Sequence, residues 1–113
     1  MKIITETLTL PELNQLAAKI FGNLVKAVVD VDRELIAVDA ELHSDLEAAL
    51  LAGGSKQENL WGINLYPETQ GDGFVEFDSL INIRPSYGNK SRGVEDPATR
   101  QRILEIVTKR VKR

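Results

Sequence analysis

Two apolar segments in the middle of the chain, joined by a turn-rich loop, constrain the fold more than any other part of the sequence. Residues 60–66 read LWGINLY and residues 74–84 read FVEFDSLINIR. Both segments are rich in β-branched and aromatic residues, which predicts strands. The loop at 67–73 contains proline, glycine and aspartate, the residues that favour turns. We therefore expect an antiparallel hairpin.

The expected register of this hairpin gives it one apolar and one polar face. We expect Tyr66 to lie opposite Phe74. Asn64 then lies opposite Glu76, and successive side chains alternate between the two faces. The face predicted to be buried carries Trp61, Ile63, Leu65, Val75, Phe77, Ile81 and Ile83. The opposite face carries Asn64, Tyr66, Glu76, Asp78, Asn82 and Arg84.

Capping signals predict three helices. Thr9 and Glu12 have the spacing of a capping box, in which each side chain binds the backbone N–H of the other residue. Ser44 and Glu47 have the same spacing. Asp96 is an N-cap residue followed by a proline at the first helical position. The predicted helices cover residues 10–21, 45–52 and 97–111.

Further strand signals complete a β-α-β-β-α-β-β-α order. They lie at residues 2–8, 24–31 and 35–42. This order predicts one α+β domain over residues 1–113, with a mostly antiparallel or mixed sheet of about five strands. We expect the helices to pack on one face of this sheet. The other face is then open to water, a cleft or a partner.

Composition excludes several kinds of site. The chain has no cysteine, which excludes disulfides and thiolate metal sites. His43 is the only histidine, so zinc sites that need two or three histidines are excluded. We assign no metal and no cofactor. No apolar run reaches the ~20 residues of a membrane-spanning helix, and polar residues interrupt the first ten positions, unlike a signal peptide. We expect a cytoplasmic protein without a membrane partner.

Charge is divided unevenly along the chain. Residues 1–83 carry five basic and fourteen acidic residues, a net charge of −9. Residues 84–113 carry nine basic and three acidic residues, a net charge of +6. This asymmetry fits a basic patch for an anionic partner. It also fits internal pairing of the two parts, or a homodimer whose subunits meet acidic to basic.

Acidic residues alternate before the histidine at the end of the third predicted strand. Asp39, Glu41 and His43 project to one face if the strand extends that far. A carboxylate beside a histidine is an acid–base pair, and both groups are also metal ligands. The strands at 24–31 and 35–42 form a hairpin of their own, and Asp78 joins these residues if that hairpin lies next to the hairpin of residues 60–84. The alternative is a solvated acidic strand face with His43 at the strand end. The candidate catalytic residues are Glu41, His43 and Asp78.

The loop after the hairpin of residues 60–84 contains candidate anion ligands. Residues 85–95 read PSYGNKSRGVE, without the spacing of a P-loop. Arginine binds phosphate and carboxylate groups through paired donors, and glycine lets backbone N–H groups approach an anion. Alternatively, Arg84 and Arg92 neutralise the acidic face. The predicted ligand-binding residues are Arg84, Asn89, Lys90, Ser91, Arg92 and Asn64.

Several motifs of the chain resemble a family of short bacterial proteins classed as a domain of unknown function. They are ELH at 41–43, GSKQENLWGINLYPE at 54–68, FDSLINIRP at 77–85 and GNKSRGVED at 88–96. The resemblance covers nearly the whole chain. It implies a stand-alone bacterial domain and carries over no catalytic residue.

Three functional hypotheses follow from these features. The first is binding of a phosphate- or carboxylate-bearing ligand at the polar sheet face and the basic loop. The second is a small hydrolase acting on RNA or a phosphoester, with Glu41 and His43 as acid and base and Arg84 stabilising an oxyanion. The third is a non-catalytic homo-oligomeric interaction module. The chain has no nucleophile-elbow motif and no nucleic-acid-binding motif, so nucleic acid is not the expected partner.

Overall fold

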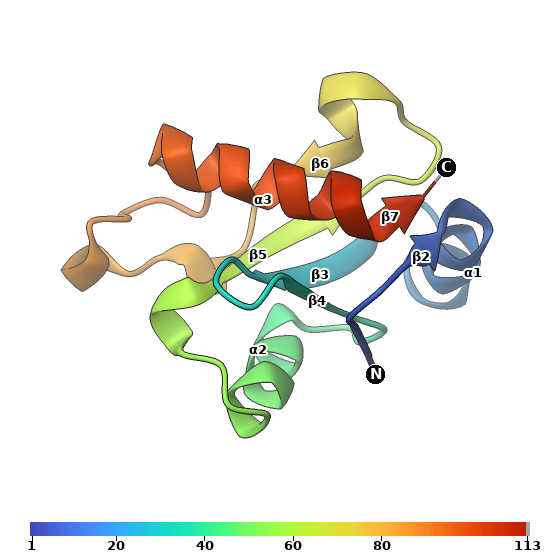
Figure 1. The fold of residues 1–113 in the computed structure, drawn as a ribbon. Coiled ribbons are helices and arrows are strands. Elements are labelled where there is room, and N and C mark those ends of the chain that lie inside the picture. Colours follow the sequence, from blue (N-terminus) through green and yellow to red (C-terminus); the bar gives the residue numbers. More distant parts are fainter. Residues whose placement is uncertain (113) are drawn as a thin grey trace.

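A five-stranded antiparallel sheet lies between helices in the computed structural model, which describes residues 1–112 (Figure 1). In spatial order its strands are β1 (Lys2–Ile4), β4 (Leu35–Val38), β3 (Val25–Asp30), β5 (Leu60–Leu65) and β6 (Val75–Glu76). A separate parallel pair consists of β2 (Leu8–Thr9) and β7 (Val111–Lys112). The helices are α1 (Leu10–Ile20), α2 (His43–Ala52) and α3 (Pro97–Arg110). The predicted α+β class, element order and antiparallel sheet are confirmed.

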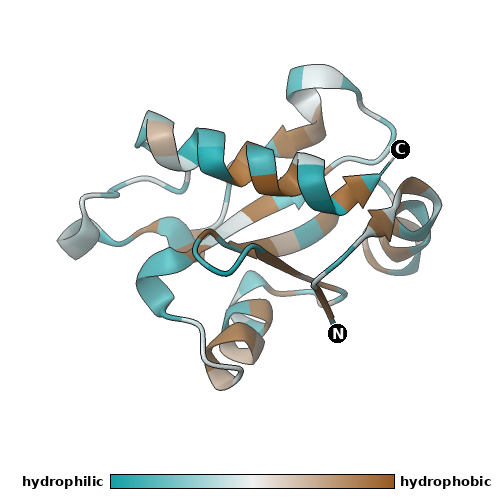
Figure 2. Ribbon diagram, viewed as in Figure 1, coloured by the Kyte–Doolittle hydropathy of each residue, from teal (hydrophilic) through white to brown (hydrophobic). Residues whose placement is uncertain are grey.

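The helices cover both faces of the sheet, whereas the sequence predicted that they share one face. Buried residues of α1 and α3, such as Leu13 and Ile103, pack with Ile63 of β5 in one apolar cluster. Leu46 and Leu50 of α2 belong to a second cluster, with Val28, Ala37 and Leu60. Central strands that are apolar on both sides need cover on both sides. Figure 2 shows hydrophobic residues along the strands and on parts of α2 and α3.

The helix starts follow the predicted capping signals at two of three places. At α1, Glu12 N–H donates to Thr9 Oγ1, and Thr9 N–H donates to Glu12 Oε1 at 3.1 Å. At α3, Asp96 accepts a hydrogen bond from the N–H of Thr99. The predicted box at Ser44 is wrong, because α2 starts two residues earlier than predicted and Ser44 lies inside it. Among residues 1–112, no helix combines the length and apolar character needed to cross a membrane.

The predicted second strand of the hairpin is much shorter than expected. The register at the turn is confirmed, since Asn64 lies opposite Glu76. After β6, however, the chain leaves the sheet and forms a 3₁₀ turn at Leu80–Asn82. Of the predicted core face, Trp61, Ile63, Leu65, Val75 and Phe77 do pack on the α1 and α3 side. Ile81 packs on the α2 side and Ile83 is 41% exposed, because the turn redirects both side chains.

A glycine and an asparagine allow this departure from the sheet. A Cβ at Gly62 would lie 2.5 Å from Ser79 Cβ, so only glycine fits beneath the crossing segment. The Asn82 side chain then takes the place of a strand partner. Its Oδ1 accepts from Gly62 N–H at 2.8 Å, and its Nδ2 donates to the Gly62 carbonyl at 2.9 Å. The backbone groups at this point are therefore satisfied without a strand.

Replacing Gly62 with alanine is expected to lower the free energy of unfolding by about 1–3 kcal/mol, the usual cost of forcing volume into a packed interior. Gly53→Ala is the matched control, since a Cβ there meets only two carbonyl oxygens at 3.6 Å. Urea unfolding of both variants measures the difference. Equal stability of the two variants would contradict the close approach of Ser79 to β5.

Candidate functional site

A cleft of about 270 Å³ opens on the α2 side of the sheet, beside the first residues of this helix. Strands β3 and β5, the start of α2 and residues 78–81 contribute to its walls, together with Arg92. Four of the residues predicted from the sequence meet here, two from each predicted site. Those four are His43, Asn64, Asp78 and Arg92.

Strand pairing puts a row of polar side chains beneath the cleft. Lys26 of β3 lies opposite Asn64 of β5, which in turn lies opposite Glu76 of β6. Residues paired across strands project to the same face. The neighbouring apolar positions, such as Val28 and Leu60, pack against α2 and hold this helix over the sheet. The start of α2 and the polar row therefore border the same space.

His43 is a buried, neutral histidine at the wall of the cleft. Its side chain is 8% exposed, and its Nε2 lies 2.8 Å from the carbonyl oxygen of Ile63. Because a carbonyl only accepts, Nε2 carries the proton and Nδ1 has the lone pair. Burial lowers the pKa of His43 below its usual 6.5, and the bond to Ile63 opposes this effect. Lys26 and Arg92 lower the pKa further, whereas Asp78 raises it.

Asn64 has a buried carbonyl oxygen without a hydrogen-bond partner in the described chain. Its Nδ2 donates to Glu76 Oε1 at 2.8 Å and, at 3.4 Å, to the Asp78 carbonyl. These two acceptors fix the orientation of the amide, which leaves Oδ1 buried and unpaired. Such a group costs about 1–3 kcal/mol when nothing donates to it. Asn64 Oδ1 therefore marks a position for a donor from a ligand or water.

Asp78 and Arg92 form an ion pair at the rim of the cleft. Arg92 Nε lies 2.6 Å from Asp78 Oδ1, and the two side chains are 55% and 40% exposed. Exposed pairs of this kind add little stability. The Arg92 backbone is well fixed, since its carbonyl accepts from Asn82 Nδ2 and from Ser79 N–H. The remaining guanidinium donors of Arg92 can therefore bind a ligand without disturbing the fold.

Arg84 lies outside this cleft and is bound to the protein backbone. Its guanidinium donates to the carbonyls of Gln57 and Leu60, and its Cζ lies 4.3 Å from the centre of the Trp61 ring. The side chain is buried, and burial lowers its pKa. These contacts secure the segment before β5, so Arg84 has a structural role in this arrangement.

The backbone N–H groups of the predicted anion loop already bind an internal carboxylate. Glu95 Oε2 accepts from the N–H groups of Lys90 and Ser91 at 2.7 and 2.8 Å, and these bonds lower the pKa of Glu95. Asn89 is buried and donates to three backbone carbonyls of the same region. None of the residues 89–91 lines the cleft. The sequence feature that could have indicated this internal contact is Glu95 itself, five residues after Lys90.

The predicted alignment of Asp39, Glu41 and His43 is wrong. Strand β4 ends at Val38, because Asp39 adopts a left-handed conformation with φ of +74°. Asp39 pairs instead with Lys19 at 2.8 Å and with the N-terminal amine. Glu41 is exposed and lies outside the residues that line the cleft. In the described part of the chain, no cluster of three or more histidine, aspartate or glutamate residues could hold a metal ion.

Lys26 and Ser44 line the cleft, and the sequence analysis missed both. Lys26 is the one residue of β3 that is not buried, which is a weak signal for a lysine that borders a site. Its pairing with Asn64 follows only from the strand order, with β3 next to β5. The spacing of Ser44 and Glu47 predicted a helix cap and gave no indication of a cleft.

The neutral state of His43 predicts how stability depends on pH. The unfolded chain binds a proton at His43 near pH 6.5, whereas the folded chain does so only at lower pH. The free energy of unfolding should therefore fall from about pH 6.5 toward the folded pKa, before most carboxylates titrate near pH 4. His43→Gln keeps an N–H donor for Ile63 and should flatten this slope. Urea unfolding across this range measures it, and an unchanged slope would contradict the assignment.

Comparison with known proteins relates the chain to one family. The family model described as "Protein of unknown function (DUF5674)" matches residues 2–110. No curated protein and no solved structure matches the chain. The match agrees with the resemblance to a domain of unknown function, while the bacterial origin stays a prediction. It covers every residue of the cleft described above.

Proposed function

We propose that this chain, which belongs to the family described as protein of unknown function (DUF5674), binds a small anionic ligand in the cleft beside α2. One observation carries the proposal. The uncapped start of α2 borders the same cleft as the cationic side chains of Lys26 and Arg92. Backbone donors and two cations thus surround one small space.

The start of α2 has free backbone donors. Leu42 occupies the N-cap position and provides no side-chain hydrogen bond. The N–H groups of Asp45 and Leu46 bond back to the Leu42 carbonyl, which leaves those of His43 and Ser44 without an intrahelical partner. The N-terminus of a helix also carries a partial positive charge. Free N–H groups and this charge together favour phosphate or carboxylate groups.

The charges around the cleft favour an anion. Lys26 Nζ lies 5.1 Å from the centre of the Phe21 ring, and in the described chain it has no carboxylate partner. Arg92 adds a second positive charge, Asp78 contributes one negative charge, and His43 is neutral near pH 7. The lining side chains therefore carry a net positive charge.

The unpaired acceptors narrow the class of ligand. Asn64 Oδ1 is buried without a donor, and His43 Nδ1 carries a lone pair. A ligand that pairs with them needs a hydroxyl or N–H group near its acid group. The cleft is about 270 Å³, smaller than typical sites for drug-sized molecules at ~300–1,000 Å³. A small hydroxylated phosphate or hydroxy acid has this combination of size and groups.

Calorimetric titration with glycerol 3-phosphate and methyl phosphate tests the proposal. We expect glycerol 3-phosphate to bind more tightly, because its hydroxyl groups can donate to the unpaired acceptors. Arg92→Gln and Lys26→Gln should each weaken binding about tenfold, since a hydrogen bond to a charged group contributes about 1.5–3 kcal/mol. Asp78→Asn should strengthen binding, because it removes the only carboxylate that lines the cleft.

Lys56→Gln is the control for these variants. Lys56 is an exposed lysine outside the cleft, so its replacement changes the net charge equally. Its effect should be small. The proposal fails if neither phosphate binds, or if Lys56→Gln weakens binding as much as Lys26→Gln.

A hydrolase acting on a phosphoester is the second candidate, and the neutral imidazole of His43 favours it. A neutral histidine with a free lone pair can accept a proton from water. Glu41 does not line the cleft, so Asp78 is the carboxylate that would act beside His43. Turnover of p-nitrophenyl phosphate that His43→Gln abolishes would support a hydrolase. Binding without turnover would leave the anion-binding function alone.

A further inference from the structure

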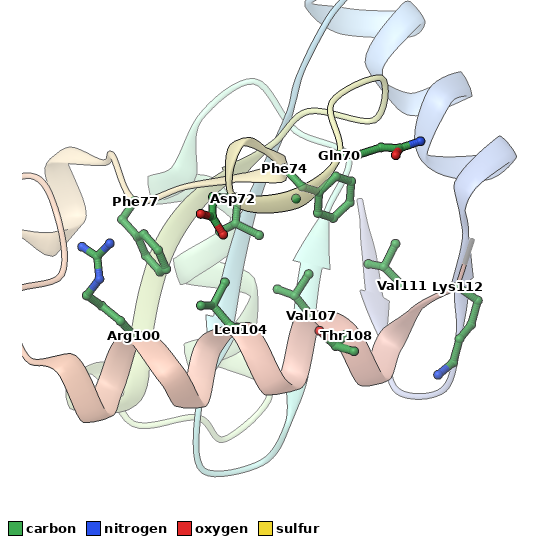
Figure 3. Close-up of a pocket in the computed structure, with 12 residues that line it drawn as sticks. Gln70, Asp72, Phe74, Phe77, Arg100, Leu104, Val107, Thr108, Val111 and Lys112 are labelled. Atoms are coloured by element: carbon green, nitrogen blue, oxygen red, sulfur yellow. The ribbon is translucent and has the colours of Figure 1, made fainter.

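A second and larger space lies on the α3 side of the sheet, away from the cleft beside α2. It is a groove of about 830 Å³ between α3 and the segment from Gln70 to Phe77. Figure 3 shows apolar side chains facing one another across it, with Phe74 and Phe77 on one side and Leu104, Val107 and Val111 on the other. None of its lining residues belongs to the cleft.

The groove lies along an edge of the sheet, where some apolar side chains are only partly covered. Strand β6 forms one edge of the sheet and has only two residues. Val75 and Phe77 pack against the core cluster but are only half-buried. On the opposite wall, Leu104 is 37% exposed. An apolar ligand that covers such water-exposed apolar surface is stabilised by removing it from water.

The two ends of the groove carry positive charge. Figure 3 shows Arg100 at one end of the apolar row and Lys112 at the other. Within residues 1–112, Asp72 is the only carboxylate that lines the groove. The Arg100 guanidinium stacks on Phe77, with Cζ 4.3 Å from the ring centre, and Nη1 donates to the Val94 carbonyl at 3.3 Å. In residues 1–112 it has no ion-pair partner.

We infer that this groove binds an amphiphilic carboxylate, with an apolar chain between the facing walls and its head group at Arg100. The apolar walls recognise the chain. Arg100 recognises the head, because a guanidinium already held by stacking loses little freedom when its remaining donors bind a carboxylate. The groove volume lies within the ~300–1,000 Å³ of small-molecule sites. Arg100 and Lys112 outnumber Asp72 along the groove, so its net positive charge disfavours a cationic head group.

Isothermal titration with n-decanoate and decan-1-ol tests the chain and the head separately. Leu104→Glu puts a carboxylate into the groove and should weaken binding of both compounds at least about tenfold. Leu51→Glu is the matched control, because Leu51 is a 39% exposed leucine on α2, outside the groove. Arg100→Gln should weaken the binding of decanoate about tenfold and leave the binding of decan-1-ol unchanged. Arg100→Lys should restore part of the decanoate affinity.

Several results would overturn this inference. The first is that the unmodified chain does not bind decanoate. The second is that Leu104→Glu and Leu51→Glu weaken binding equally. The third is that Arg100→Gln lowers the affinity for decanoate and for decan-1-ol by the same factor. Sedimentation in the absence of decanoate provides a further check. A dimer that Leu104→Glu dissociates would assign the groove to a second copy of the chain. Far-ultraviolet circular dichroism of each variant verifies that it is folded.

Discussion

The paired hydrogen bonds between the Asn82 side chain and the backbone of Gly62 determine how the middle of this protein is built. They satisfy β5 where a strand partner is missing, so the chain can leave the sheet after β6. The crossing segment then lies against the α2 side of β5, where only a glycine leaves room for Ser79. Asp78 is thereby held beside Asn64. Arg92 is held there as well, because its backbone carbonyl accepts a hydrogen bond from the Asn82 side chain. The polar cleft depends on this arrangement.

The start of helix α2 forms the wall of the cleft that faces the sheet. Leu46 and Leu50 attach this helix to the apolar part of the sheet, while its first residues extend over the polar row of Lys26 and Asn64. Burial keeps His43 neutral, so the cleft combines two cations and free helix donors with unpaired acceptors. The groove beside α3 has apolar side chains on both walls, Arg100 and Lys112 at its ends and the carboxylate of Asp72 among its lining residues. The two faces of one small sheet thus present spaces of different chemistry.

Local signals predicted the fold well, and long-range contacts limited the prediction of the site. The caps at Thr9 and Asp96 depend on residues three positions apart, and both formed as expected. The strand predicted at residues 74–84 was too long, because its apolar pattern does not reveal that the Asn82 side chain replaces a strand partner for Gly62. The predicted anion loop shows a second limit. Two of its N–H groups bind Glu95, and although Glu95 is part of the loop sequence, the sequence does not reveal that its carboxylate turns back onto Lys90 and Ser91.

An NMR titration of the ¹⁵N-labelled chain with inorganic phosphate tests the central claim most directly. If the cleft binds the anion, the largest shifts occur at the backbone amides of His43 and Ser44, because these N–H groups have no intrahelical partner and border the cleft. Shifts centred on Lys90 and Ser91 would contradict it, since they would mean that phosphate displaces Glu95 from the loop. An unchanged spectrum at saturating phosphate would contradict it as well.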